Sequence, residues 1–147
     1  MTEAAQIRDL LHRLEEAMNS RELDLLDDII ADDFVRHCEA TPDFDVRSRE
    51  DFKEFLRQNS SSFPDNVQTF VQVVVEGDRA GIWTTYEGTQ TGPLGPFPPS
   101  GRSVRFDFGG IVRVQDGKLA ELWVTWDNMT ILGQLGHLPA PDAPPGD

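Results

Sequence analysis

Residues 104–127, VRFDFGGIVRVQDGKLAELWVTWD, decide the fold. Apolar side chains alternate with polar or small ones on both sides of Asp116-Gly117, a dipeptide typical of a tight hairpin turn. The pattern predicts one strand over Val104–Val114 and a returning strand over Leu119–Asp127.

A second hairpin precedes the first one in the chain. Valines and polar residues alternate over Val67–Val75, Glu76-Gly77-Asp78 is a turn, and Arg79–Gln90 is predicted to be the returning strand. Residues 91–101, TGPLGPFPPSG, contain four prolines and three glycines and therefore predict a loop between the two hairpins.

Helical patterns fill the N-terminal part of the chain. Apolar residues at helical spacing predict a helix from Ile7 to Met18 and a shorter one from Leu23 to Ile30. Ser48, with Asp51 three residues later, predicts the N-cap of a third helix. Residues 34–37 (FVRH) fit a short strand or an extended turn, and residues 129–135 fit a closing helical turn that ends at Gly136.

This order of elements predicts an α+β fold. Helices come first and hairpins follow, so we expect N-terminal helices packed on a strongly curved, mainly antiparallel and mostly four-stranded sheet. A curved sheet covered by helices on its concave side forms a cone that encloses a pocket, which is a common ligand site. We expect one such domain over residues 1–136 and a Pro-rich C-terminal tail over residues 137–147.

Composition excludes several classes of function. The chain has 147 residues, 13 basic and 26 acidic, and its formal net charge of −13 disfavours binding to nucleic acid or to an acidic membrane surface. No apolar stretch predicts a membrane span, and the charged start of the chain does not resemble a secretory signal, so we expect a cytoplasmic protein. The single cysteine, Cys38, excludes an internal disulfide, and three scattered histidines predict no metal site.

The C-terminal third also carries a family resemblance. The order of elements along nearly the whole chain resembles that of the SnoaL-like polyketide cyclases, which belong to the nuclear-transport-factor-2-like superfamily. The stretches that resemble this family are Gly101–Val104, Arg113–Leu119, Glu121–Trp123 with Asp127, Gln134–Gly136, and the earlier Asp33–His37. The resemblance implies a cone fold, a homodimer formed through the sheet, and cyclisation of an apolar or polycyclic polyketide by intramolecular aldol condensation without metal, nucleotide or other cofactor. It also implies that Asp127 is the acid/base and places His37 near the mouth of the pocket.

The residues around Asp127 suit this chemistry. An aldol cyclisation needs a base, and burial in an apolar pocket raises the pKa of a carboxylate toward neutrality. Trp123, Thr125 and Asp127 share one face of the predicted strand and are candidate pocket residues. The alternative is that Asp127 caps the helix beginning near Asn128, and the two roles are compatible.

The hairpin turn decides the position of Asp107, the second candidate acid/base. With a three-residue turn, Arg105 lies opposite Asp127 and Asp107 lies beside them. With a two-residue turn, Phe106 lies opposite Asp127, Phe108 lies opposite Thr125, and Asp107 points away. The continuous apolar face that includes Phe106 and Phe108 favours the second arrangement, with Asp107 in a surface ion pair as the alternative role.

Three further residues are candidates for the site. Histidine is the side-chain type that titrates near neutrality, so His37 fits a proton shuttle or a group that polarises a carbonyl, whereas a hydrogen-bonded structural role is the alternative. Trp83 and Tyr86 lie on opposite faces of their predicted strand, so one of them is expected to contact the substrate. An isomerase, dehydratase or epoxide hydrolase on the same fold, or a noncatalytic small-molecule-binding dimer, are the alternative functions.

Overall fold

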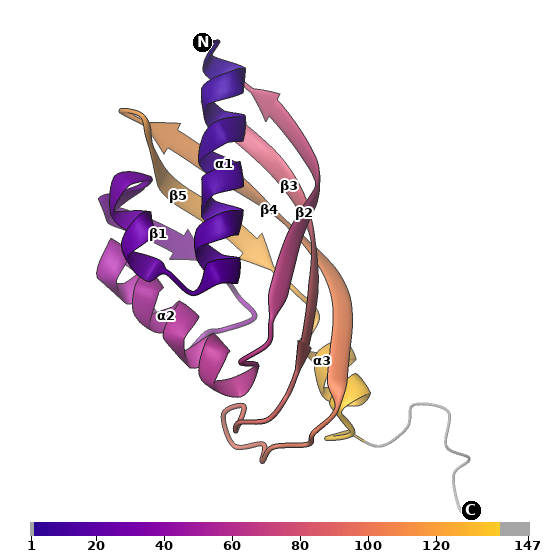
Figure 1. The fold of residues 1–147 in the computed structure, drawn as a ribbon. Coiled ribbons are helices and arrows are strands. Elements are labelled where there is room, and N and C mark those ends of the chain that lie inside the picture. Colours follow the sequence, from indigo (N-terminus) through magenta and orange to yellow (C-terminus); the bar gives the residue numbers. More distant parts are fainter. Residues whose placement is uncertain (1, 139–147) are drawn as a thin grey trace, which may run out of the picture.

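Residues 2–138 of the computed structural model form helices arranged on one curved sheet (Figure 1). The elements in chain order are α1 (Glu3–Ser20), the 3-10 helix η1 (Leu23–Asp28), β1 (Ile30–His37), α2 (Arg49–Ser62), β2 (Val67–Glu76), β3 (Arg79–Thr89), β4 (Ser103–Gln115), β5 (Lys118–Thr125) and α3 (Asn128–Leu135). Most of the tail predicted over residues 137–147 lies outside the described residues, namely from 139 onward. None of the described helices is long and apolar enough to cross a membrane.

The sheet has five strands in the order β1-β5-β4-β3-β2. All neighbouring pairs are antiparallel except β1 and β5, which are parallel. In Figure 1, α1 and α2 lie across the same side of the sheet, whereas α3 lies beside the first residues of β4. The α+β class with helices on a curved, mainly antiparallel sheet is confirmed. The expectation of mostly four strands is wrong, because the segment predicted at residues 34–37 is the end of a full strand that begins at Ile30.

The helices form where the sequence predicts them, for identifiable local reasons. The apolar stripe of α1 is buried, and the hydroxyl oxygen of Thr2 caps the helix by accepting from the Ala5 amide at 3.1 Å. The predicted N-cap at Ser48 is confirmed, with Oγ accepting from the Asp51 amide at 3.0 Å. The shorter helix predicted over Leu23–Ile30 ends earlier, because Ile30 already belongs to the edge strand.

A β-bulge in β5 sets the register of the last hairpin. The turn is the two-residue Asp116-Gly117, because Gln115 pairs with Lys118. Pairing then slips by one residue at Ala120, so that Arg113 faces Glu121 instead of Ala120.

This bulge changes the predicted pairings, and it leaves the predicted face of β4 unchanged while moving Trp123 and Thr125 of β5 to the outer face. Thr125 lies opposite Gly109, so the expected pairing of Phe108 with Thr125 is wrong. The predicted pairing of Phe106 with Asp127 is also absent from the described strand pairs. Phe106 and Phe108 nevertheless face the helices, because alternation along β4 is unchanged.

Candidate functional site

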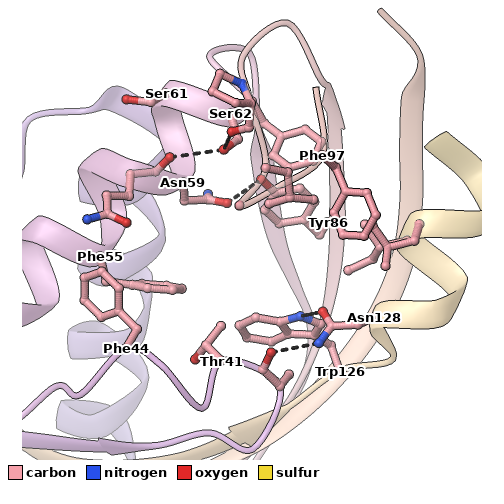
Figure 2. A pocket seen from close by; sticks show the side chains of 18 of the residues that line it. Thr41, Phe44, Phe55, Asn59, Ser61, Ser62, Tyr86, Phe97, Trp126 and Asn128 are labelled. Atoms are coloured by element: carbon pink, nitrogen blue, oxygen red, sulfur yellow. Dashed lines mark hydrogen bonds between the residues drawn. The ribbon is translucent and has the colours of Figure 1, made fainter. Parts of the chain in front are cut away.

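A cavity of about 570 Å³ lies between α2, the 91–101 loop, the start of α3 and the sheet (Figure 2). This volume lies within the usual range for small-molecule sites. We name it the main cavity, and it is lined by Ala40, Thr41, Phe44, Phe55, Gln58, Asn59, Ser61, Ser62, Phe63, Gln68, Tyr86, Pro93, Leu94, Gly95, Pro96, Phe97, Phe106, Phe108, Trp126, Asn128, Ile131 and Leu132. The lining is mainly aromatic and aliphatic, so the cavity suits a predominantly apolar molecule.

A row of aromatic rings forms the sheet side of the main cavity. The Tyr86 and Phe106 rings stack with centroids 5.0 Å apart, and Phe106 and Phe108 follow at 5.9 Å. Trp126 meets Phe108 edge to face at 5.8 Å. The strand alternation that buries one face of β4 therefore also produces a continuous aromatic wall.

A hydrogen bond between strand β3 and helix α2 lies in the wall of the main cavity. The Tyr86 hydroxyl donates to Oδ1 of Asn59 at 2.9 Å, as Figure 2 shows. Burial raises the pKa of Tyr86, so the hydroxyl remains protonated at neutral pH. This bond uses only the Oδ1 atom of Asn59. The amide Nδ2 of Asn59 has no protein acceptor among the described residues and can donate to a ligand oxygen.

Short hydrogen bonds fix the loops that close the main cavity. The Ser62 hydroxyl donates to the Pro93 carbonyl at 2.7 Å, which fastens the 91–101 loop to the end of α2. Gly92 is required there, since a Cβ at this position would lie 2.0 Å from the Ser61 carbonyl oxygen. On the other side, Trp126 Nε1 donates to Asn128 Oδ1 at 2.9 Å, and Asn128 Nδ2 donates to the Ala40 carbonyl at 2.7 Å.

Comparison with known proteins agrees with this architecture. The family model described as SnoaL-like polyketide cyclase matches residues 8–135. The chain belongs to this family. No curated protein matches it significantly.

Solved structures with the same fold come from several Streptomyces species. IdmH of Streptomyces antibioticus, a candidate polyketide cyclase, is 32% identical over 88% of this chain and 97% of its own, with a TM-score of 0.78. TsrD of Streptomyces laurentii is 30% identical over 91% and 97%, with a TM-score of 0.77. AclR of Streptomyces galilaeus, a candidate hydroxylase, is 25% identical over 94% and 100%, with a TM-score of 0.79.

In this SnoaL-like chain, Asp127 is the N-cap of α3. Its Oδ1 accepts from the amides of Met129 and Thr130 at 2.9 and 3.3 Å, and Oδ2 accepts from the Thr130 hydroxyl at 2.9 Å. The bond from the Thr130 hydroxyl, followed by that from its amide, lowers the pKa of Asp127. Asp127 is absent from the lining of the main cavity, so this geometry supports the capping role.

Asp107 also lies outside the main cavity. Its Oδ1 accepts from the Thr85 hydroxyl at 2.7 Å, and with Arg105, Asp127 and Thr130 it borders a separate depression of about 270 Å³. Arg105 pairs with Glu87 at 2.9 Å rather than with Asp107. The inward-facing Arg-x-Asp cluster, one of the two sequence alternatives, is therefore not formed.

The outer face of the sheet holds Asp107 and four more of the predicted site residues. His37 donates from Nε2 to Glu121 at 2.6 Å and stacks on Trp123 at 5.3 Å, which places both on the side away from the helices. Trp83 and Thr125 lie on this same face, and Trp83 is 45% exposed. Of the pair Trp83 and Tyr86, only Tyr86 lines the main cavity.

Of the residues that line the main cavity, the sequence predicted only Tyr86, Phe106 and Phe108, and the two most important ones that it missed are Trp126 and Asn59. Trp126 lines the wall of the main cavity where Trp123 and Thr125 were expected, because its side chain points to the opposite face of the chain from theirs. Asn59 lies in α2, and its only sequence signal was a polar residue near the apolar positions Phe52, Phe55 and Leu56. No group of three or more His, Cys, Asp or Glu side chains that could hold a metal ion occurs in residues 2–138.

Proposed function

We propose that this SnoaL-like protein binds an apolar, carbonyl-bearing molecule of the polyketide class in the main cavity and promotes its ring closure. The single observation that carries the proposal is the aromatic cavity of about 570 Å³ with the hydrogen-bonded Tyr86–Asn59 pair in its wall. Membership of the family and similarity to a candidate polyketide cyclase support it.

The geometry favours catalysis by confinement and carbonyl orientation. Folding a linear chain against the aromatic wall brings its reacting carbons together and offsets the entropy cost of closing a ring. The Nδ2 of Asn59, held by Tyr86, is placed to donate to a carbonyl oxygen on which negative charge develops. Tyr86 is the only titratable side chain in the lining given by the described residues, so the proton removed from the nucleophilic carbon passes to water, and the alkoxide formed by ring closure takes a proton from water.

Binding without turnover is the second candidate function. It is favoured by the full engagement of Asp127 in capping α3, since that carboxylate was the predicted acid/base. The acid/base role of Asp127, the role of Asp107 and His37, the absence of a cofactor and a cytoplasmic location stay predictions. Asp127→Asn tests the first of these, because asparagine preserves the cap but cannot act as a base.

A binding experiment tests the proposed ligand class. Isothermal titration with 2-acetylnaphthalene, an apolar ketone, should show saturable binding to the wild-type protein. Leu132→Trp fills the main cavity and should abolish that binding, whereas Leu25→Trp, the same change at an exposed position in η1, should leave it intact. Absence of binding to the wild type, or equal binding to both variants, contradicts the proposal.

Turnover requires its own assay. A linear polyketide thioester incubated with the protein should give a cyclic product with the mass of the substrate, or of the substrate less one water, since an aldol closure and dehydration change nothing else. Asn59→Ala should slow this reaction more than Ser61→Ala, a nearby lining change without the Tyr86 bond. Equal rates in both variants contradict the carbonyl-orienting role of Asn59.

A homodimer through the outer face of the sheet is also proposed. Val74, Gly81, Ile111, Trp123 and His37 form one row across the five strands, and Val74 and Ile111 are 70% and 48% exposed. Exposed apolar side chains in such a row are typical of interfaces. Sedimentation equilibrium should give a dimer for the wild type and a monomer for Ile111→Glu, and a wild-type monomer contradicts the proposal.

A further inference from the structure

Arg36 is a buried cation with no carboxylate partner among the described residues. Its side chain lies inside the fold at 6% exposure, on the face of β1 that points toward the helices. The other buried or nearly buried cations are neutralised: Lys53 lies 2.6 Å from Asp27, and Arg49 lies 2.6 Å from Asp32. An unpaired buried charge is costly, so its presence calls for a specific explanation.

The surroundings of Arg36 connect it to the main cavity. Its guanidinium carbon lies 3.9 Å from the centre of the Phe55 ring and 5.7 Å from that of Trp126. Its Nη2 donates to the Thr41 hydroxyl at 2.9 Å. Phe55, Trp126 and Thr41 all line the main cavity, so the guanidinium lies directly behind that wall.

One nitrogen of Arg36 has no hydrogen-bond acceptor among the described residues. Nη1 is fully buried and has no hydrogen-bond partner among residues 2–138. Arg36 borders a smaller cavity of about 80 Å³, which shares Phe55, Gln68, Phe108 and Trp126 with the main cavity. This annex has room for a small polar group but not for a ring system of polyketide size.

We propose that Arg36 binds the carboxylate of an apolar carboxylic acid, with the carboxylate in the annex and the apolar body in the main cavity. The proposal rests on the proposed function and specifies its ligand class. A carboxylate would accept from Nη1, which has no partner among the described residues, and would neutralise the buried Arg36 cation. Burial lowers the pKa of Arg36, but an arginine remains protonated at neutral pH, so the positive charge is present in the free protein.

The net charge of the protein makes this proposal sharply testable. At −13, the overall field repels anions, so a preference for an anionic ligand must come from a local cation. The lining of the main cavity contains no lysine or arginine, and the annex contributes only Arg36. A carboxylate preference in the wild-type protein is therefore the first result that the proposal requires, and the Arg36 variant then assigns it to this side chain.

The experiment compares 2-naphthoate with 2-naphthamide, which has the same ring and nearly the same shape without the charge. Isothermal titration at pH 7 should show the carboxylate binding roughly tenfold or more tightly, the usual gain for a charged hydrogen bond. Equal affinities contradict the assignment to Arg36 but leave the proposed function intact. Binding of neither compound, together with no binding of 2-acetylnaphthalene, contradicts the proposed function itself.

Two variants complete the test. Arg36→Met keeps an unbranched side chain of similar length and should remove the preference for 2-naphthoate while leaving the affinity for 2-naphthamide unchanged. Arg79→Met is the matched control, since Arg79 also lies over a tryptophan ring, Trp123, at 5.1 Å, but on the outer face. Persistence of the preference in Arg36→Met, or its loss in Arg79→Met, overturns the proposal. Near-native circular dichroism of each variant confirms that the comparison is between folded proteins.

Discussion

Replacing Tyr86 by phenylalanine removes the hydrogen bond with Asn59 in the wall of the main cavity. The change removes one hydroxyl and keeps the ring, which packs on Phe106 at 5.0 Å and on Phe63 at 5.8 Å. No packing cavity is created, so the loss is that of one neutral hydrogen bond, about 1 kcal/mol net. Asn59 is only partly buried and faces the cavity, so water replaces the lost donor and keeps the cost near this value.

Urea denaturation followed by circular dichroism measures this cost. We expect the free energy of unfolding to fall by about 1 kcal/mol and the melting temperature by roughly 2–4 °C for a domain of this size. A double-mutant cycle with Asn59→Ala should show a coupling of the same order, since the two side chains share one bond. Thr85→Val is the matched control, because the Thr85 hydroxyl donates to Asp107 on the exposed outer face. This change should lower the free energy of unfolding by less than about 0.5 kcal/mol.

The result that would refute this reasoning is a wild-type stability in Tyr86→Phe together with a coupling near zero. That outcome would mean that the hydroxyl and Asn59 do not hold each other in solution. The orientation of the Asn59 amide, and with it the carbonyl-binding role proposed for that side chain, would then lose its structural basis.

Three further predictions concern the cap, the outer face and the 91–101 loop. Asp127→Ala should lower the melting temperature by roughly 2–4 °C through loss of the α3 cap, without changing the affinity for 2-acetylnaphthalene measured by titration; an affinity loss would show that Asp127 reaches the ligand. The bond from His37 lowers the pKa of Glu121, so the free energy of unfolding of the wild type should decline as pH falls below about 4.5. Glu121→Gln should flatten that decline in urea titrations at pH 3–6. An unchanged dependence of the unfolding free energy on pH would exclude the contribution of Glu121. Gly92→Ala should destabilise the protein by about 1–3 kcal/mol in urea, because the new Cβ meets the Ser61 carbonyl, whereas Gly133→Ala, with open space around it, should not; equal stability of the two variants would contradict the close approach.

Most of the fold was predictable because it depends on side-chain periodicity over long segments. The stripe of α1 and the alternation of β2 to β5 each involve many residues, so single errors do not change the element type. The edge strand β1 was only partly recognised, because Asp32 and Asp33 interrupt its apolar pattern. Those two aspartates lie at the stretch of β1 where the register with β5 is irregular, and Ile30 and Phe34 on either side are buried.

The site was less predictable because it depends on single residues. One extra residue, Ala120, shifts the pairing of β4 with β5, and no turn or glycine signal marks it. The shift leaves Phe106 and Phe108 at the cavity wall, but it changes which residues of β5 lie opposite them. Trp126 consequently lines the cavity while Trp123 lies on the outer face, and sequence alone did not separate these two tryptophans.

Strand β1 shows the same effect on the chemistry of the site. The sequence makes His37 a candidate because histidine is the side-chain type that titrates near neutrality. Alternation along the strand, however, places His37 on the outer face of the sheet and its neighbour Arg36 on the face toward the helices. On the outside, His37 has Glu121 and Trp123 as partners and is satisfied. On the inside, Arg36 has aromatic rings, Thr41 and one unfilled nitrogen. A ligand can accept a hydrogen bond from the nitrogen of Arg36 that has no partner. The acidic composition of the whole chain is compatible with this buried cation, because the two lie in different parts of the molecule. A negative surface and a single buried arginine together favour a ligand that is apolar over most of its length and anionic only at the end that reaches Arg36.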